Sequence, residues 1–256
     1  MKKIGLFVVT LICSLSLNAQ AREYYQLKIY TFDTEAQQQS TDDYLKNAFL
    51  PTLKRLGIEN VGVFKPHPKD DGETPKQTYV LIPFKSIVEF GLLDDTLAKD
   101  KAHQETGKAY WEAAHDNAPY KRIESIFMKA FVDMPKMEPS KLDGPRKDRI
   151  YELRSYEAAT ENLYRKKVDM FNAGGEVELF DQLDFNAVFY AEVLSGANMP
   201  NLMYMTTHAD RKIRDANWKA FVESPEWEKL KVMPKYQNTV SRNDTRLLYP
   251  TEYSDY

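Results

Sequence analysis

An internal repeat constrains this chain more than any other feature. Residues 25–30 read YQLKIY and residues 151–156 read YELRSY, so both fit the pattern Y-[QE]-L-[KR]-x-Y. Further paired segments follow in the same order in each half: 62–64 with 187–189, 79–82 with 203–206, 110–120 with 226–236, and 125–128 with 245–248. One short match would be chance, but an ordered series indicates that one structural unit is duplicated.

Each copy reads as strand, helix, strand, strand, helix, strand. In the first copy, aromatic and β-branched residues predict strands at 24–31, 60–65, 77–83 and 122–131. Ser40-Thr41-Asp42-Asp43 can cap a first helix that ends at Gly57, and Ser86 with Glu89 forms a capping box for a second helix that runs to about Ala114. In the second copy, Ser224 and Pro225 start the last helix.

This order predicts an α+β fold built from two tandem ferredoxin-like (βαββαβ) units. Helices cover only one face of such a sheet, so we expect the units to pack sheet to sheet as an intramolecular α/β barrel. The expected units span residues 22–134 and 148–256. Residues 135–147, rich in proline, glycine and charge, read as the linker between them.

The N-terminus has the features of a signal peptide at residues 1–21. Lys2 and Lys3 precede an apolar run at 4–17, which ends at Ala19-Gln20-Ala21. Such a run is short for a membrane span, which needs about 20 residues. We therefore expect cleavage near Ala21, no stable membrane anchor, and a periplasmic or secreted protein.

Composition excludes several kinds of site. The one cysteine, Cys13, lies in the signal peptide, so the mature chain has no disulfide and no cysteine metal site. The net charge of −3 gives no basic patch for nucleic acid. No phosphate loop, nucleophile elbow or zinc-binding His pair occurs, so we expect no metal and no cofactor, and the catalytic residues stay unknown. The tail at 249–256 is expected to be frayed.

The second unit resembles the NIPSNAP family. The residues that carry the resemblance are 151–156, Ser224-Pro225-Glu226-Trp227 and 245–248, whereas the first unit departs from the pattern with Gln26 and Lys28. The resemblance implies the dimeric α/β-barrel superfamily, which includes haem-binding proteins, cofactor-free monooxygenases, isomerases and members of no known activity. Whether this chain is an enzyme, and whether it forms a homodimer, stays open.

Strand alternation supplies the candidate site. Side chains two residues apart share a face, which groups Gln26, Lys28 and Tyr30, and likewise Glu152, Arg154 and Tyr156. We expect Leu27 and Leu153 to face the helices and the polar trios to face the barrel interior. There Arg154 would hold an anionic group and Glu152 or Tyr156 would move a proton. The alternative is that these charges pair and serve the structure alone.

Two histidines are further candidates. His103 and His115 flank an aromatic face at Tyr110 and Trp111, and either could be a haem ligand or a base. The alternative is that both are packed or rim residues.

The leading hypothesis for the function of the protein is an exported binding protein for a small anionic or aromatic molecule. The alternatives are a non-enzymatic structural or assembly module, a cofactor-free monooxygenase or isomerase, and a haem-binding barrel.

Overall fold

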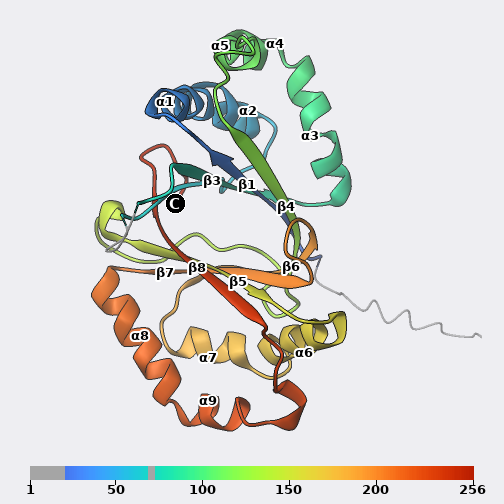
Figure 1. The fold of residues 1–256 in the computed structure, drawn as a ribbon, viewed down its shortest axis with the longest axis vertical. Coiled ribbons are helices and arrows are strands. Elements are labelled where there is room, and N and C mark those ends of the chain that lie inside the picture. Colours follow the sequence, from blue (N-terminus) through green and yellow to red (C-terminus); the bar gives the residue numbers. More distant parts are fainter. Residues whose placement is uncertain (1–20, 69–72) are drawn as a thin grey trace, which may run out of the picture.

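The computed structural model of the protein describes residues 21–68 and 73–256. Figure 1 shows a strand barrel at the middle of the molecule, with helices in one layer above it and another layer below. The strands are β1 (Tyr24–Thr31), β2 (Gly62–Pro66), β3 (Gln77–Phe84), β4 (Arg122–Ala130), β5 (Ile150–Glu157), β6 (Ala187–Ser195), β7 (Asn201–His208) and β8 (Arg242–Pro250).

The helices fall into one group per half of the chain. The first layer contains α1 (Glu35–Tyr44), the π-helix η1 (Leu45–Phe49), α2 (Leu50–Arg55), α3 (Ile87–Lys99), α4 (Lys101–Thr106) and α5 (Lys108–Trp111). The second contains α6 (Glu161–Phe171), α7 (Glu176–Gln182), α8 (Arg211–Glu223) and α9 (Pro225–Leu230). The short 3-10 helices are η2 (Arg146–Asp148) and η3 (Pro234–Tyr236).

The strands close into one antiparallel barrel in the order β1-β3-β2-β8-β5-β7-β6-β4. Within this ring the first half contributes β4-β1-β3-β2 and the second half β8-β5-β7-β6, so the ferredoxin-like strand order occurs twice. The predicted fold class is therefore confirmed: two ferredoxin-like units form an intramolecular α/β barrel.

Two seams join the halves by backbone hydrogen bonds as well as by packing. Strand β2 pairs with β8 from Phe64↔Pro250 to Pro66↔Leu248, and β4 pairs with β6 from Met128↔Val193 to Ala130↔Ala191. Each sheet thus uses the other as the partner for its outer strands. This closure removes the open edges that a lone four-stranded sheet would expose.

The barrel interior is an apolar core, and this makes the predicted assignment of faces wrong. Leu27 and Leu153 lie in that core with Tyr25, Phe64, Met128, Tyr151, Phe189 and Met205. The trios Gln26, Lys28, Tyr30 and Glu152, Arg154, Tyr156 therefore point to the helical layers. The packed side chains of this core exclude water, so ionised groups among them would be costly. The space between sheet and helices opens at its margins, where charged ends can reach solvent.

Helix boundaries differ from the predictions at two places. The first helix begins at Glu35, because the Thr34 hydroxyl accepts a hydrogen bond from the Gln37 amide at 3.2 Å, and not after Ser40–Asp43. The single helix expected up to Ala114 is three helices, α3 to α5. Asp100 interrupts it by capping α4 through the His103 amide at 2.8 Å. The starts at Ser86 and Ser224 are confirmed, since each hydroxyl caps its helix.

The C-terminal tail is packed, and the expectation that it frays is wrong. Ser254 Oγ accepts a hydrogen bond from the Val63 amide at 2.9 Å, and the Asp255 carboxylate accepts one from the Val61 amide at 2.9 Å. The Tyr256 ring is buried in the barrel core against Phe64 and Tyr151. The tail therefore closes one end of the barrel.

Most of the predicted signal peptide, residues 1–20, lies outside the described residues. In the part of the chain that is described, every helix is too short or too polar to cross a membrane.

Candidate functional site

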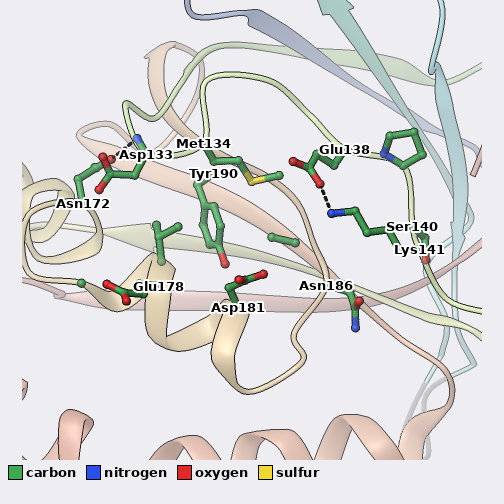
Figure 2. Close-up of a pocket in the computed structure, with 14 residues that line it drawn as sticks. Asp133, Met134, Glu138, Ser140, Lys141, Asn172, Glu178, Asp181, Asn186 and Tyr190 are labelled. Atoms are coloured by element: carbon green, nitrogen blue, oxygen red, sulfur yellow. Dashed lines mark hydrogen bonds and ion pairs between the residues drawn. The ribbon is translucent and has the colours of Figure 1, made fainter. Parts of the chain in front are cut away.

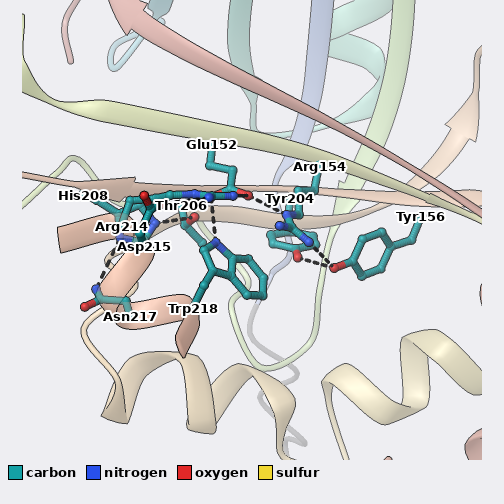
Figure 3. A network of polar contacts seen from close by, with 10 residues as sticks. All are labelled: Glu152, Arg154, Tyr156, Tyr204, Thr206, His208, Arg214, Asp215, Asn217 and Trp218. Atoms are coloured by element: carbon teal, nitrogen blue, oxygen red, sulfur yellow. Dashed lines mark hydrogen bonds and ion pairs between the residues drawn. The ribbon is translucent and has the colours of Figure 1, made fainter. Parts of the chain in front are cut away.

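The polar side chains of β5 meet α8 in one hydrogen-bond network, which Figure 3 shows. Glu152 is fully buried and both its oxygens are occupied. Oε1 accepts hydrogen bonds from Arg154 Nε at 2.7 Å and Arg214 Nη2 at 2.8 Å. Oε2 accepts from Arg214 Nε at 2.7 Å and Trp218 Nε1 at 2.8 Å. One carboxylate thus satisfies donors from a strand and from a helix.

Helix periodicity explains why α8 can supply two of these donors. Arg214 and Trp218 are four residues apart and therefore lie on the same face. The helix is set by Asp210, whose carboxylate caps it through the Ile213 amide at 2.8 Å. The guanidinium of Arg154 lies 3.8 Å from the centroid of the Trp218 ring, so the same tryptophan also packs on the strand's cation.

The network continues along the strand away from α8. Arg154 Nη1 donates to the Tyr156 hydroxyl at 3.1 Å, and this hydroxyl lies 2.8 Å from that of Tyr204 on β7. At the other end, Arg214 also pairs with Asp215 at 2.8 Å. The polar side chains of this network therefore act as hydrogen-bond and ion-pair partners of one another.

Electrostatics fix the charge states of this network. Burial by itself raises the pKa of Glu152, but hydrogen bonds from Arg214 and Trp218 and the charges of both arginines outweigh burial and hold it at about 2. Burial raises the pKa of Tyr204 well above its ordinary value. Burial also lowers the pKa of the neighbouring His208 to about 4, so it is neutral at pH 7. A carboxylate held this firmly in its ionised form is a poor proton carrier near neutral pH.

The equivalent trio of the first unit makes no ion pair with any residue that the structure describes. Gln26 Nε2 donates to Ser125 Oγ at 2.8 Å, and Lys28 Nζ lies 5.4 Å from the centroid of the Phe49 ring. Tyr30 packs edge-on against Tyr120. The two units have thus diverged at this position, and the structure does not bring the two trios together.

The two candidate histidines occupy different environments. His103 is fully buried. Its Nε2 accepts from Trp111 Nε1 at 3.2 Å and lies 3.2 Å from the Tyr44 hydroxyl, while its Nδ1 lies 3.2 Å from Thr52 Oγ1. His115 is exposed in the turn after α5. The geometry around His103 is that of a packed residue with both ring nitrogens occupied.

A cavity lies elsewhere in the described part of the protein, and Figure 2 shows it. Its volume is about 570 Å³. The wall comes from the linker, the α6–α7 turn, α7 and the start of β6. The lining residues are Asp133, Met134, Glu138, Pro139, Ser140, Lys141, Asn172, Gly175, Val177, Glu178, Asp181, Asn186, Ala187 and Tyr190. None of the six predicted trio residues is among them.

Tyr190 forms the buried part of this cavity. The residue is 1% exposed, and its hydroxyl has no hydrogen-bond partner in the described part of the protein. Burial, together with the charges of Glu176 and Asp181, raises its pKa well above the ordinary value, so the hydroxyl keeps its proton. An unpartnered buried hydroxyl is costly and is unusual in a folded protein.

Sequence reasoning missed this cavity for a definite reason. Its walls come from residues 133–141 and from 172–190, which are distant in the chain and which no motif connects. The sequence predicts only a linker at 135–147, yet the Glu138 amide donates a hydrogen bond to the Val188 carbonyl at 3.0 Å and so fixes this segment beside β6. The local excess of acidic residues at 176–184 was the only signal available.

Comparison with known proteins identifies the family of the second unit. The NIPSNAP family model matches residues 151–255. The second unit is a NIPSNAP domain. This match includes the opening strand with Glu152 and Arg154 and the packed tail, so the network and the cavity both involve the NIPSNAP domain. No curated protein matches the chain.

Solved structures show how the whole barrel compares. The fold is similar to that of a proposed monooxygenase from Lactobacillus acidophilus, with 11% identity and a TM-score of 0.55 over 90% of this chain and 94% of that one. A proposed monooxygenase from Fusobacterium nucleatum gives 10% identity and 0.51 over 90% and 93%. An anthrone oxidase-like protein gives 12% and 0.50 over 91% and 93%. Identities this low show the barrel fold alone and nothing of the chemistry of this chain.

Proposed function

We propose that this NIPSNAP-type barrel is an exported binding protein for a small molecule, and that the ligand occupies the cavity beside α7. One observation carries the proposal: Tyr190 lines a cavity of about 570 Å³, and its buried hydroxyl has no hydrogen-bond partner among the described residues. A volume of this size is typical of small-molecule sites. A bound ligand would satisfy the hydroxyl.

Binding is favoured over catalysis by the state of the other polar groups. Glu152 and Arg154 are occupied by Arg214, Trp218 and Tyr156. His103 is buried with partners on both ring nitrogens. The barrel interior is packed with apolar side chains. No described group in the cavity combines a nucleophile with a base at hydrogen-bond distance, which covalent catalysis requires.

A structural module remains the second candidate, and the closed network of Glu152 favours it. The double variant Glu152→Gln with Arg154→Met tests this role. A large loss of stability with unchanged ligand binding would assign the network to the structure. A double variant that stays folded but no longer binds the ligand would show that Glu152 and Arg154 belong to the binding site.

Native mass spectrometry tests the binding proposal. The mature protein, purified from the compartment in which it accumulates, is expected to carry a mass excess that is released on denaturation. Ser140→Trp, which places an indole in the cavity from the linker, is expected to lose that excess. Circular dichroism checks that this variant is folded, and Asp95→Asn on the exposed face of α3 is the matched control.

A clean apo mass for both the wild-type protein and the control would count against the proposal. So would an excess that Ser140→Trp retains, because the ligand would then lie elsewhere.

Export is a separate part of the proposal. It is supported by the charged, apolar and small-residue regions of residues 1–21. Determination of the N-terminus of the protein in its own cells is expected to find Arg22 first. An intact Met1 in the cytoplasmic fraction would contradict it.

A further inference from the structure

The cavity of the NIPSNAP domain has an acidic rim. Asp133, Glu178 and Asp181 are exposed carboxylates on its wall, and none of them has a salt bridge within the described residues. The one lysine of the lining, Lys141, pairs with Glu138 at 2.6 Å and so brings no uncompensated positive charge. Three carboxylates are thus left to determine the potential at the entrance. This rim attracts cations and repels the anion expected from the sequence.

The deeper part of the cavity is apolar around one polar atom. Met134, Val177 and Ala187 pack against the aromatic core of the second unit, and the ring of Tyr190 belongs to that core. Figure 2 shows the Tyr190 hydroxyl directed towards the side of the cavity occupied by Asp181, with Met134 near the opposite end of the ring. A ligand that fills the site therefore needs an apolar body and a polar group.

Each part of the lining selects one chemical feature. The carboxylates favour a positive charge at the rim. The methionine, valine and alanine side chains favour an apolar or aromatic group. The protonated hydroxyl of Tyr190 can accept a hydrogen bond from an N–H group, as well as donate one. A protonated amine attached to an apolar group has all three features.

We propose that the cavity binds a protonated primary or secondary amine that carries a compact apolar or aromatic group. The amine would lie between Asp181 and Glu178, within reach of the Tyr190 hydroxyl, and the apolar group would lie against Met134 and Val177. This inference rests on the proposed function. It adds the charge of the ligand and the residues that select it.

Three probes of similar shape and different charge test the inference. These are 2-phenylethylammonium, the neutral 2-phenylethanol and the anionic 3-phenylpropanoate, each titrated against the full mature protein by ligand-observed NMR. The expected order of affinity is ammonium, then alcohol, then carboxylate. Asp181→Asn and Glu178→Gln are each expected to weaken the ammonium by about 2- to 5-fold, the range for exposed charge pairs, and to leave the alcohol unchanged.

Tyr190→Phe tests the buried hydroxyl. This variant keeps the ring and is expected to weaken the ammonium by roughly 3- to 10-fold, the value of one hydrogen bond. Asp95→Asn, which removes an exposed carboxylate on α3, is expected to change nothing. Raising the salt concentration is expected to weaken the ammonium and spare the alcohol.

The outcomes separate the two proposals. Equal binding of all three probes at a site that Ser140→Trp blocks would support a binding cavity and overturn its preference for amines. Stronger binding of 3-phenylpropanoate than of 2-phenylethylammonium would likewise overturn the preference for amines. Binding of the ammonium that survives Asp181→Asn, Glu178→Gln and Tyr190→Phe would overturn the assigned residues. Failure of all three probes to bind at millimolar concentration would overturn the inference.

Discussion

A single carboxylate organises the polar interior of the NIPSNAP domain. Glu152 accepts four hydrogen bonds from three donor residues on β5 and α8. Charge-assisted bonds of this kind are stronger than neutral ones, and a buried charge without partners is very costly. The position therefore tolerates neither loss of the charge nor loss of the arginines. It is a residue whose effect should be visible in the pH dependence of stability.

Glu152 is expected to stabilise the protein above pH 4.5 and to lose that effect in acid. Its pKa is 4.5 in the unfolded chain and about 2 in the fold. The folded pKa is the lower one, so the contribution is fully present above pH 4.5 and disappears as the pH falls towards 2. The difference corresponds to a free energy of unfolding on the order of 3 kcal/mol. Urea denaturation from pH 7 to pH 2 measures it.

The Glu152→Gln variant provides the comparison for this pH profile. Other acids titrate in both proteins, so the informative quantity is the difference between the two curves. That difference is expected to be large at pH 6 and to shrink below pH 4.5. A difference that stays constant down to pH 2 would show that Glu152 has an ordinary pKa.

At the level of elements, α8 is attached to the barrel through two side chains of one helical face. Arg214 and Trp218 reach Glu152, and the ring of Trp218 also packs on Arg154 and Phe185. At the equivalent strand position of the first unit, Gln26 replaces the carboxylate and bonds to Ser125 on the neighbouring strand. An ion pair between sheet and helix in that unit joins Lys65 of β2 to Asp42 of α1 instead. The two units thus use different strands for their polar attachment of helix to sheet.

Trp218→Phe is expected to lower the free energy of unfolding by about 1–2 kcal/mol. The variant keeps an aromatic ring but leaves Oε2 of buried Glu152 with one donor fewer. Trp227→Phe is the matched control, because Trp227 packs against Phe221 and no hydrogen bond of its indole is found in the described residues. Chemical denaturation measures the free energy of unfolding of both variants, and Trp218→Phe is expected to lose more. Equal losses would mean that ring size, and not the hydrogen bond, sets the effect.

On the scale of the whole molecule, the two units share one core. Side chains from β1 to β8 meet inside the barrel, and the tail returns to place Tyr256 between Phe64 of the first unit and Tyr151 of the second. The seams at β2–β8 and β4–β6 make each unit the edge partner of the other. Neither unit can therefore lose its structure without exposing the core of both.

Tyr256→Ala is expected to destabilise the whole chain in one cooperative transition. Removing a buried aromatic side chain costs about 3–5 kcal/mol, and some of this is regained where the chain end relaxes. Tyr249→Ala, which removes a ring packed on His67 outside the barrel core, should cost less. Differential scanning calorimetry is the measurement. Two separate transitions in either protein would show that the units unfold independently.

The sequence by itself determined the repeated unit, its order of elements and the barrel. Repetition and the alternation of strands and helices are local properties, and an unpaired sheet face requires a partner. Ser86 and Ser224 could also be assigned from local chemistry, because a cap involves residues three apart.

Only the tertiary structure decided which face of the strands is buried inside the barrel and where a ligand can bind. Alternation divides Leu27 from Lys28 and Leu153 from Arg154, but it has the same form whichever face is inside. Closure of the barrel excludes water from one face and leaves the polar trios beside the helices. The cavity at Tyr190 likewise arises because the linker packs beside α7 and β6, a contact between segments that have no common pattern in the sequence.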